Sequence, residues 1–397
     1  MPEHMVHVGV DATSWANHRG FGRFTRELTT ALAARESGFR YTLLFDREPS
    51  TPLPRGVGVL CASTQRALNE AAVGASSRSP LYLWAMGRLA RAARFDLVFF
   101  PTLYSFFPLF SATRCVVCFH DATAERMPQL LFPTRMNRLL WRAKTLLARR
   151  QATRVMTISQ ASATDLARLL RIAPDRIDVV TEAPAQAFRV AADSAAADAE
   201  RRRHGVPDAA KLFVHVGGMN PHKNILKLLE AMPRAIAARP DVHLALVGDT
   251  SGKGFWDNVA ELRAFVAGNA RLAEHVHFTG YLGDEALAAL LNGAEALVFP
   301  SLWEGFGLPA VEAMACGVPV LASRRGSLPE VIGDAGLYFE PEDAGAIAAC
   351  MLRILDDGAL RARLAGLART RAGLFHWERA AELAEASFRR ALAGGSR

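Results

Sequence analysis

The chain is poor in cysteine and has no long uncharged stretch, and each shortage excludes a class of protein. Its five cysteines among 397 residues are scattered, and only Cys115 and Cys118 form a C-x-x-C pair. No second pair completes a zinc site, so we interpret both as buried strand residues of a protein in the reducing cytoplasm. The longest uncharged stretch, residues 97–113, is too short and too interrupted by proline to span a membrane. The first twelve residues lack the basic and then apolar pattern of a signal peptide, which also predicts a cytoplasmic protein.

Acidic residues are missing from residues 126–164, and the first half of the chain is basic. Residues 1–185 contain 24 Lys and Arg against 14 Asp and Glu, whereas residues 186–397 contain 23 against 25. A basic segment with interleaved Trp141 and leucines is typical of a helix that lies on anionic lipids, so we expect peripheral binding to the inner face of the membrane. We expect the aromatic residues 106–110 to add to that surface. The alternative is an ordinary solvated helix in an arginine-rich chain, and no motif indicates nucleic-acid binding. The basic residues of the segment are Arg126, Arg135, Arg138, Arg142, Lys144, Arg149, Arg150 and Arg154.

Short apolar runs alternate with helical patterns along the whole chain, which predicts an α/β protein with parallel sheets. Residues 184–207, rich in alanine and charge, are interpreted as a linker between an N-terminal domain, residues 1–183, and a C-terminal domain, residues 208–375. Sheets of this kind bind ligands at the carboxyl ends of their strands. The expected strands are Val6–Val10, Tyr41–Phe45, Leu97–Phe100, Cys115–Phe119 and Arg154–Ile158 in the first domain, and Leu212–Val216, Val242–Val247, Val276–Phe278, Ala296–Phe299 and Val318–Ala322 in the second.

Residues 295–333 carry the most informative pattern. The apolar run Ala296–Phe299 has the length of a buried strand, and a turn containing Gly305 and Gly307 follows it. Proline suits the first turn of a helix, which predicts a helix over Pro309–Cys316. The exposed amides at the start of such a helix bind anions such as phosphate.

Two glutamates flank this turn, and with it they resemble a known family. Glu304 precedes Gly305-Phe306-Gly307, and Glu312 lies eight residues further on, with Gly-Val-Pro-Val at 317–320 and Ser-Leu-Pro-Glu-Val at 327–331. This pattern resembles the large family 4 of retaining glycosyltransferases, which use nucleotide-diphosphate sugars. The alternative is that both carboxylates only cap and solvate a helix start. The resemblance implies the GT-B fold, in which two Rossmann-like domains with parallel sheets face a cleft and a last helix, residues 376–397, returns to the first domain.

The resemblance assigns roles to the residues around this turn. Glu304 is expected to hold sugar hydroxyls near the reacting carbon, and Glu312 is expected to bind the ribose. Because the turn lies between strand and helix, we expect the two carboxylates to project from different elements. The backbone that would bind the diphosphate is that of Gly305, Phe306, Gly307 and Leu308.

A second loop of the C-terminal domain follows the strand Leu212–Val216. Lys223 matches a basic residue that the family uses to neutralise the diphosphate, so we expect it to take part in both donor binding and catalysis. Gly218, also expected at the donor, stands where many members carry arginine, and His222 replaces an arginine of one branch. The form Pro-x-Lys-Asn resembles a branch that contains many mannosyltransferases.

Two features of the N-terminal domain are expected to contribute to the same reaction. His120 follows the strand Cys115–Phe119, and in the family the histidine at this place lies close to the transferred sugar. The alternative is a histidine whose hydrogen bonds are satisfied by Asp121 or by a loop carbonyl. Gly20 and Gly22 match the glycine loop that closes on the donor diphosphate, although a tight turn explains the two glycines equally well.

No Asp-x-Asp occurs in the chain, although metal-dependent sugar transferases of the other common fold generally use that motif to hold a divalent ion. We therefore expect no metal and no other cofactor, with Lys223 and backbone amides carrying the charge of the leaving group. The resemblance implies retention of configuration, with same-face attack and a leaving phosphate that helps to deprotonate the acceptor.

Several other interpretations are less favoured. Residues 248–254 fail as a Walker A loop, because the spacing is wrong and Gly254 replaces the required hydroxyl. Ser327 and Glu330 have the spacing of a capping box, which would explain them fully. A nicotinamide or flavin oxidoreductase would need a full G-x-G-x-x-G motif after the first strand, and a sugar phosphorylase would need a pyridoxal-lysine site. The chain shows neither.

The sequence therefore predicts a retaining hexosyltransferase of cell-surface polysaccharide synthesis. GDP-mannose is the favoured donor and a UDP-sugar the alternative, and the acceptor is expected to be a glycan or a lipid-linked molecule. Two alternatives remain open: a catalytically inactive subunit that binds a sugar nucleotide, and a GT-B enzyme with a soluble small-molecule acceptor.

Overall fold

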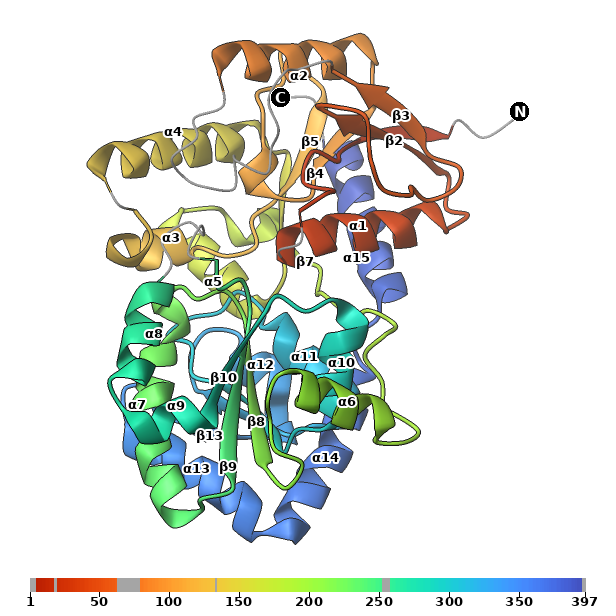
Figure 1. Cartoon of the computed structure of the whole chain (residues 1–397). Helices are drawn as coiled ribbons and strands as arrows, with labels where there is room; N and C mark the ends of the chain where they lie inside the picture. Colours follow the sequence, from red (N-terminus) through yellow and green to blue (C-terminus); the bar gives the residue numbers. More distant parts are fainter. Residues whose placement is uncertain (1–4, 18–19, 63–78, 133, 252–257, 395–397) are drawn as a thin grey trace. The chain divides into compact units, whose positions relative to one another are not determined.

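The computed structural model describes residues 5–17, 20–62, 79–132, 134–251 and 258–394 (Figure 1). The chain folds into two compact units. Unit 1 comprises Met1–Glu182 and His376–Arg397, and unit 2 comprises Ala183–Phe375.

Unit 1 is built on a seven-stranded parallel sheet with the strand order β3-β2-β1-β4-β5-β6-β7. The central strands are buried on both faces, which explains why they are continuous apolar runs in the sequence. The strands are β1 (Val6–Asp11), β2 (Phe39–Phe45), β3 (Gly58–Cys61), β4 (Leu97–Phe100), β5 (Arg114–Cys118), β6 (Arg154–Thr157) and β7 (Ile177–Val179). The helices are α1 (Gly20–Ala33), α2 (Pro80–Ala92), α3 (Thr123–Arg126), α4 (Arg135–Gln151), α5 (Gln160–Leu169) and α15 (Trp377–Ala393).

The C-terminal helix α15 packs in unit 1, although it is far from the rest of this unit in sequence. Asp178 of β7 accepts hydrogen bonds from Ser387 Oγ at 2.6 Å and from Arg390 Nη2 at 2.7 Å. Burial opposes ionisation of Asp178, but hydrogen bonds from Arg154 and Ser387 outweigh burial and lower its pKa. The carboxylate therefore stays charged and joins α15 to the edge of the sheet.

Unit 2 contains a six-stranded parallel sheet with the order β10-β9-β8-β11-β12-β13. The strands are β8 (Lys211–Val216), β9 (Val242–Val247), β10 (Val276–Gly280), β11 (Ala296–Phe299), β12 (Val320–Ser323) and β13 (Gly336–Phe339). The helices are α6 (Ala195–Arg203), α7 (Ile225–Ala238), α8 (Val259–Ala267), α9 (Ala270–His275), α10 (Asp284–Asn292), α11 (Leu308–Ala315), α12 (Leu328–Ile332), α13 (Ala344–Asp356) and α14 (Gly358–Ala372).

All ten predicted strands are present, but three edge strands were missed. The strands β3 and β13 are partly exposed, and β7 has only three residues with Asp178 at its centre. None of the three forms an apolar run long enough to recognise from sequence. The segment interpreted as a linker also has structure of its own, because it contains α6, which packs on α10 in unit 2.

Each sheet reverses its direction of growth at one place, between β1 and β4 in unit 1 and between β8 and β11 in unit 2. Loops that leave such neighbouring strands in opposite directions open a crevice at the carboxyl edge of a sheet. In unit 2, the loop after β8 contains Lys223 and the loop after β11 contains Glu304. In unit 1, His120 lies two residues after the end of β5, which is the neighbour of β4.

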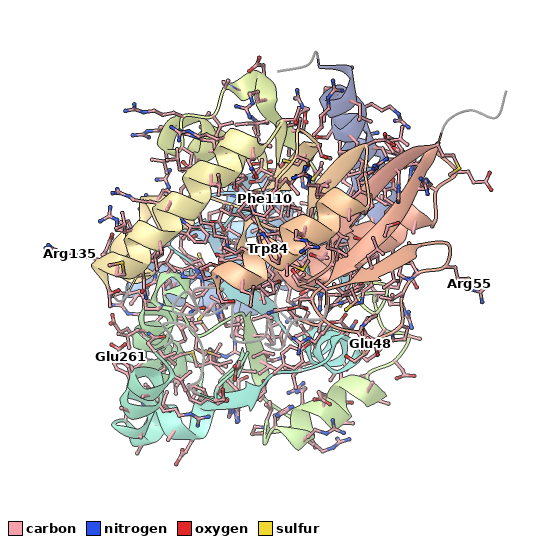
Figure 2. The ribbon with its side chains drawn as sticks, turned by 90° about the horizontal axis from the view of Figure 1, so that it is seen from above. Glu48, Arg55, Trp84, Phe110, Arg135 and Glu261 are labelled. Carbon is pink, nitrogen blue, oxygen red and sulfur yellow. The ribbon has the colours of Figure 1, made fainter. Side chains whose placement is uncertain are left out.

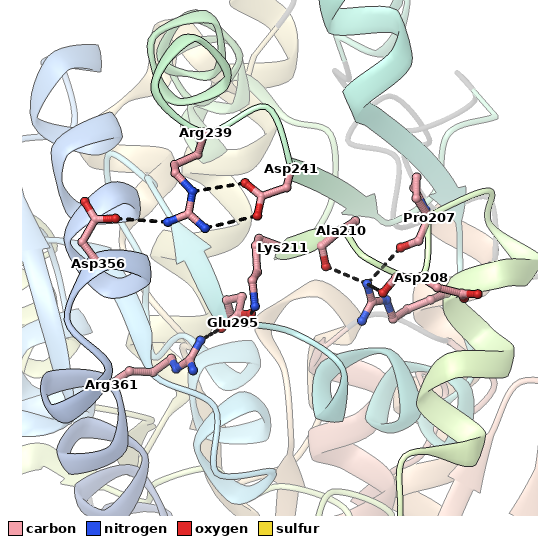
Figure 3. Close-up of polar contacts among 10 residues, drawn as sticks. Pro207, Asp208, Ala210, Lys211, Arg239, Asp241, Glu295, Asp356 and Arg361 are labelled. Atoms are coloured by element: carbon pink, nitrogen blue, oxygen red, sulfur yellow. Dashed lines mark hydrogen bonds and ion pairs between the residues drawn. The ribbon is translucent and has the colours of Figure 1, made fainter.

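Ion pairs gather at the opposite, amino edge of the unit 2 sheet (Figure 3). Lys211 at the start of β8 lies 3.1 Å from Glu295, which precedes β11 and also pairs with Arg361 of α14. Arg239 similarly pairs with Asp241 and with Asp356 of α13, both at 3.1 Å. These contacts fix helices to strand starts, and they leave the loops at the carboxyl edge for a ligand site.

Candidate functional site

The loops after β8 and β11 are joined to each other by hydrogen bonds. Leu302 N–H donates to His222 O at 2.8 Å. Asn224 adopts a left-handed conformation, and its amide donates to Pro300 O at 3.1 Å and to Pro341 O at 2.7 Å. The side chains that these loops carry are therefore held in fixed positions at the carboxyl edge of the sheet.

Lys223 and Glu304 form an ion pair between these two loops. Lys223 Nζ lies 2.6 Å from Glu304 Oε1, and the side chains are only 15% and 10% exposed. Burial opposes ionisation of Glu304, but the positive charges of Lys223 and His222 outweigh it and lower the pKa of this carboxyl. A cation and a carboxylate are thus both retained in a largely desolvated place, where charges act strongly on a ligand.

The turn between Glu304 and α11 depends on glycine and on a buried serine. Gly307 has φ +95°, and a Cβ atom there would lie 2.7 Å from Leu328 Cδ2. The Ser327 hydroxyl lies 3.1 Å from Glu304 O and 2.8 Å from Phe306 O, and Ser327 N–H donates to Glu304 O at 3.2 Å. The capping-box interpretation of Ser327 was wrong, because its side chain makes no cap bond to α12 and supports this turn instead.

The helix α11 begins at Leu308, one residue before the prediction, and Gly307 precedes it without a side-chain cap. The turn residues Gly305, Phe306 and Gly307 are buried, and the Phe306 ring packs edge-on against Phe375 at 5.5 Å between centroids. The start of α11 is therefore held rigidly beside the Lys223–Glu304 pair.

Glu312 lies inside α11, whereas Glu304 lies in the turn before it, so the two carboxylates come from different elements as predicted. Glu312 is only 3% exposed. Cys316 follows Glu312 by one helical turn, and burial, with the negative charge of Glu312, raises the pKa of its thiol to about 12. Gly218, by contrast, lies exposed just after β8.

In unit 1, His120 lies at the carboxyl edge of the sheet. Its Nε2 is 2.9 Å from Pro101 O, at the end of β4, and its ring packs edge-on against Phe24 at 4.9 Å. Because a carbonyl only accepts, Nε2 carries the proton, and Nδ1 lies 3.8 Å from Glu182. Burial lowers the pKa of His120, so the ring is neutral near pH 7. Of the two alternatives for this histidine, the carbonyl of Pro101 is its hydrogen-bond partner, whereas Asp121 accepts from Thr123 N–H and acts on the ring only through its charge.

Gly20 and Gly22 form the first turn of α1. Gly20 is exposed, whereas a Cβ atom on Gly22 would lie 2.1 Å from Asn17 O. The close approach of the Asn17 carbonyl to Gly22 therefore explains this glycine by itself. Residues 18 and 19, which precede Gly20, lie outside the described residues, as do residues 252–257 of the stretch considered as a Walker A loop.

The helix α4 presents an exposed apolar face. Five side chains spaced at one side of the helix are 38–60% exposed, whereas Thr145 and Ala148 pack inward. Arg135, Arg138 and Arg142 are exposed beside this face. We call this surface the α4 face; its apolar residues are Met136, Leu139, Leu140, Leu146 and Leu147.

Other residues expected at this basic surface have structural contacts instead. Phe106, Phe107 and Leu109 are buried in the core of unit 1, so the prediction that the aromatic segment is a surface was wrong except for Phe110. Trp141 is partly buried and donates to Glu125 Oε1 at 2.8 Å. Arg149 donates to Leu170 O. Acidic residues outside the acid-free segment also neutralise two of its arginines, since Arg126 pairs with Asp165 and Arg154 with Asp178.

Two more residues of the site, His215 and Asn224, were given no role from the sequence, and Ser327 was predicted only as a helix cap. A signal existed for His215, which is a polar residue inside the apolar run Leu212–Val216.

Cys115 and Cys118 are buried and free, as their place in a strand indicated. Among the described residues, no group of three or more His, Cys, Asp or Glu side chains is arranged to hold a metal ion, and no helix is long and apolar enough to cross a membrane.

Two family models match this chain and divide it near the unit boundary. Residues 196–371 match the model described as glycosyl transferases group 1, and residues 18–182 match that of glycosyltransferase family 4. Together with the two parallel sheets, these matches define a glycosyltransferase of the GT-B fold. The chain belongs to glycosyltransferase family 4.

Curated relatives in this family include mannosyltransferases. O-antigen chain mannosyltransferase B of Escherichia coli is 31% identical over 278 residues, which cover 67% of each chain. MMP alpha-(1->4)-mannosyltransferase of Mycolicibacterium hassiacum is 35% identical over 249 residues, which cover 62% of this chain and 56% of that protein. The match to the second relative therefore spans little more than half of its length.

Solved structures with the same fold cover nearly the whole chain. Sucrose-phosphate synthase of Thermosynechococcus elongatus has a TM-score of 0.75 at 22% identity, with 98% of this chain and all of that one covered. HepE of Anabaena, solved in complex with UDP and glucose, has a TM-score of 0.74 at 20% identity over the same shares. At these identities the likeness concerns the fold alone.

Proposed function

We propose that this chain transfers mannose from GDP-mannose, with retention of configuration, to a glycan or lipid-linked acceptor of cell-surface polysaccharide synthesis. The observation that carries the proposal is the buried Lys223–Glu304 pair beside the start of α11. The mannosyltransferase relatives and the Pro-x-Lys-Asn sequence support the sugar. A UDP-sugar is the second candidate donor, because HepE, which shares the fold, was solved with UDP.

The proposed chemistry begins with the donor diphosphate at the start of α11. Lys223 and the backbone N–H groups of residues 305–308 stabilise its negative charge, and Glu312 accepts hydrogen bonds from the ribose. Gly218, and Gly20 and Gly22 of unit 1, are proposed to approach the same diphosphate through their backbones. These groups need no metal ion to neutralise the leaving group.

At the sugar, the bond between the anomeric carbon and the phosphate oxygen breaks, and its electron pair leaves with the diphosphate. The acceptor oxygen forms its bond on the same face, and its proton passes to the departing phosphate oxygen. Glu304 holds sugar hydroxyls and lowers the energy of the developing positive charge. His120 is proposed to accept a hydrogen bond from the sugar at Nδ1, the ring nitrogen that does not donate to Pro101 O.

A panel of sugar nucleotides tests the donor. A ligand present at a hundred times its dissociation constant stabilises the folded protein by about 2.7 kcal/mol, which raises the unfolding temperature measurably. We expect GDP-mannose to give the largest shift, followed by release of GDP when a mannose-terminated glycan is added. A larger shift in unfolding temperature with a UDP-, ADP- or dTDP-sugar would show that this sugar nucleotide, and not GDP-mannose, is the donor. Tight binding with neither hydrolysis nor transfer for any acceptor would instead show an inactive sugar-nucleotide-binding protein.

We also propose that unit 1 lies on the cytoplasmic face of the membrane, next to a lipid-linked acceptor. The α4 face combines exposed leucines with arginines, as do helices that lie in the lipid headgroup region. A second group of exposed apolar side chains in unit 1 supports membrane binding. Leu81, Trp84 and Phe110 are 71%, 47% and 44% exposed, and Trp84 and Phe110 lie close together in Figure 2. Arg88 stacks over Trp84 at 4.6 Å, so charge accompanies the aromatic rings here too.

A further inference from the structure

His215 is a fully buried histidine near the carboxyl end of β8, one residue before the strand gives way to the loop that carries Lys223. Its Nδ1 lies 3.0 Å from Val298 O on the neighbouring strand β11. A carbonyl oxygen only accepts hydrogen bonds, so Nδ1 carries the ring proton and Nε2 keeps a lone pair.

The Nε2 atom has no hydrogen-bond partner within the part of the chain that the structure describes. A buried acceptor without a partner is unfavourable, and native proteins rarely keep one without a reason. An apolar residue would satisfy this position in the strand at least as well. The polar atom therefore indicates a role beyond packing.

The space in front of Nε2 is shared with Lys223. A Cβ atom placed on Gly217 would lie 3.7 Å from His215 Nε2 and 3.6 Å from Lys223 Cε, so both side chains border the same small volume. Burial, with the positive charge of Lys223, lowers the pKa of His215 to about 4. The ring is thus neutral at physiological pH, and its lone pair remains available to a donor.

Lys223 supplies a matching donor. Its ammonium has three N–H groups, and the structure assigns one of them to Glu304 at 2.6 Å. When a diphosphate takes a second, the third needs an acceptor in a site that is mostly shielded from water. The unused lone pair of His215 borders the same small volume as the Lys223 side chain.

We infer that His215 is a positioning residue, whose Nε2 accepts an N–H of the Lys223 ammonium, directly or through one water molecule, while the diphosphate is bound. This inference rests on the proposed function, since it needs Lys223 to act on a diphosphate. Three acceptors around one ammonium hold its charge in a single place before the reaction begins, which is the condition for strong electrostatic stabilisation of a leaving group.

Two substitutions separate this role from simple packing. His215→Asn keeps an N–H near Val298 O but removes the acceptor at the Nε2 position, whereas His215→Gln places an amide oxygen near the Nε2 position. With GDP-mannose we expect His215→Asn to lower kcat about 10- to 100-fold, more than it weakens GDP binding, and His215→Gln to recover most of that loss. A residue that only packs against β11 would give the opposite order, which would overturn the inference.

A matched control is His243→Asn, which changes another buried histidine of the same sheet at the start of the neighbouring strand β9. It should leave kcat unchanged while altering stability. Circular dichroism and thermal unfolding of each variant identify any loss that comes from misfolding, and His215→Gln keeps the comparison usable if His215→Asn does not fold.

Nitrogen spectra of ¹⁵N-histidine-labelled protein test the contact without any turnover. We expect His215 to show a protonated Nδ1, and its Nε2 resonance to move when inorganic pyrophosphate is added and to lose that response in Lys223→Met. An Nε2 signal identical in wild type and Lys223→Met, with and without pyrophosphate, would overturn the contact. If every sugar nucleotide failed to react while this response remained, the proposed function would fail and the role of His215 beside Lys223 would stand.

Discussion

Lys223 Nζ lies 2.6 Å from Glu304 Oε1, although the two residues are 81 positions apart in the chain. The pair exists because β8 and β11 are neighbours at the place where the unit 2 sheet reverses its direction of growth. The loops that follow these strands are bonded to each other through His222 O and Leu302 N–H. A cation and a carboxylate are thereby held together in a place that is shielded from water before any donor arrives.

Replacement of Glu304 should affect turnover more than donor binding, because this carboxylate is proposed to act at the reacting sugar. We expect Glu304→Ala to lower kcat at least tenfold more than it weakens donor affinity, as measured by steady-state kinetics and calorimetry. Glu304→Gln is the conservative partner, since it keeps an acceptor for Lys223. Removing one member of a buried ion pair also destabilises a fold by about 3–5 kcal/mol, so thermal unfolding must accompany the assay. Equal losses in kcat and affinity would contradict the assigned role.

Glu312→Ala should chiefly weaken nucleotide binding. A hydrogen bond to a charged group contributes about 1.5–3 kcal/mol, which corresponds to a loss of roughly 10- to 150-fold in affinity for GDP. Isothermal titration of GDP measures it directly. Glu330→Ala, an exposed glutamate of α12, is the control and should leave the affinity unchanged. Unaltered GDP binding by folded Glu312→Ala would remove this residue from the site.

Transfer should continue without a divalent metal, because the chain has no Asp-x-Asp and Lys223 and backbone amides are proposed to carry the phosphate charge. The measurement is release of GDP from GDP-mannose by extensively chelated protein in excess EDTA, compared with the same protein given Mg²⁺ or Mn²⁺. Activity that disappears in EDTA and returns only with the metal would refute a metal-free site.

The stability of unit 2 should fall as the pH decreases from about 6.5 to 4. Burial, with the charges of His275 and His277, lowers the pKa of His243 from 6.5 to about 4. The charge of Arg201 also lowers this pKa, whereas that of Asp241 raises it. The folded chain keeps His243 neutral, whereas the unfolded chain binds a proton below pH 6.5, so protons favour unfolding throughout this range. Urea midpoints at pH 4.5, 5.5 and 7.5 should rise with pH. His243→Gln should flatten part of that rise, and the exposed His376→Gln should not.

Binding to anionic vesicles should depend on the α4 face. Each arginine near an anionic surface contributes about 1 kcal/mol, so replacing Arg135, Arg138 and Arg142 by glutamine should weaken binding roughly 100-fold without changing GDP affinity. Cosedimentation with phosphatidylglycerol vesicles measures it, and binding should also weaken with salt. The control with equal charge loss replaces Arg202, Arg203 and Arg271 of unit 2, which are exposed. Equal binding by both variants would leave the α4 face as an ordinary solvated surface and would favour a soluble acceptor.

The amino-acid sequence by itself determined the buried strands and the local geometry of the turn before α11. Parallel strands covered on both faces must be apolar along their whole length, so runs such as Ala296–Phe299 and Val242–Val247 are visible without any knowledge of their neighbours. Gly307 is similarly local, because its positive φ is a property of one residue's backbone. These signals were sufficient to predict the fold class and the candidate phosphate-binding turn.

Only the tertiary structure decided which polar side chains meet. Ser327 has the spacing of a helix cap, yet its hydroxyl bonds to Glu304 O and Phe306 O, because the chain returns to that turn through β12. The positive charge of the basic segment is likewise reduced by residues from other elements, since Asp165 pairs with Arg126 and Asp178 with Arg154. The aromatic residues that looked suited to lipid are mostly core. Hydrogen bonds and ion pairs act over a few ångströms in space, and a linear pattern contains no information on contacts between residues far apart in the chain.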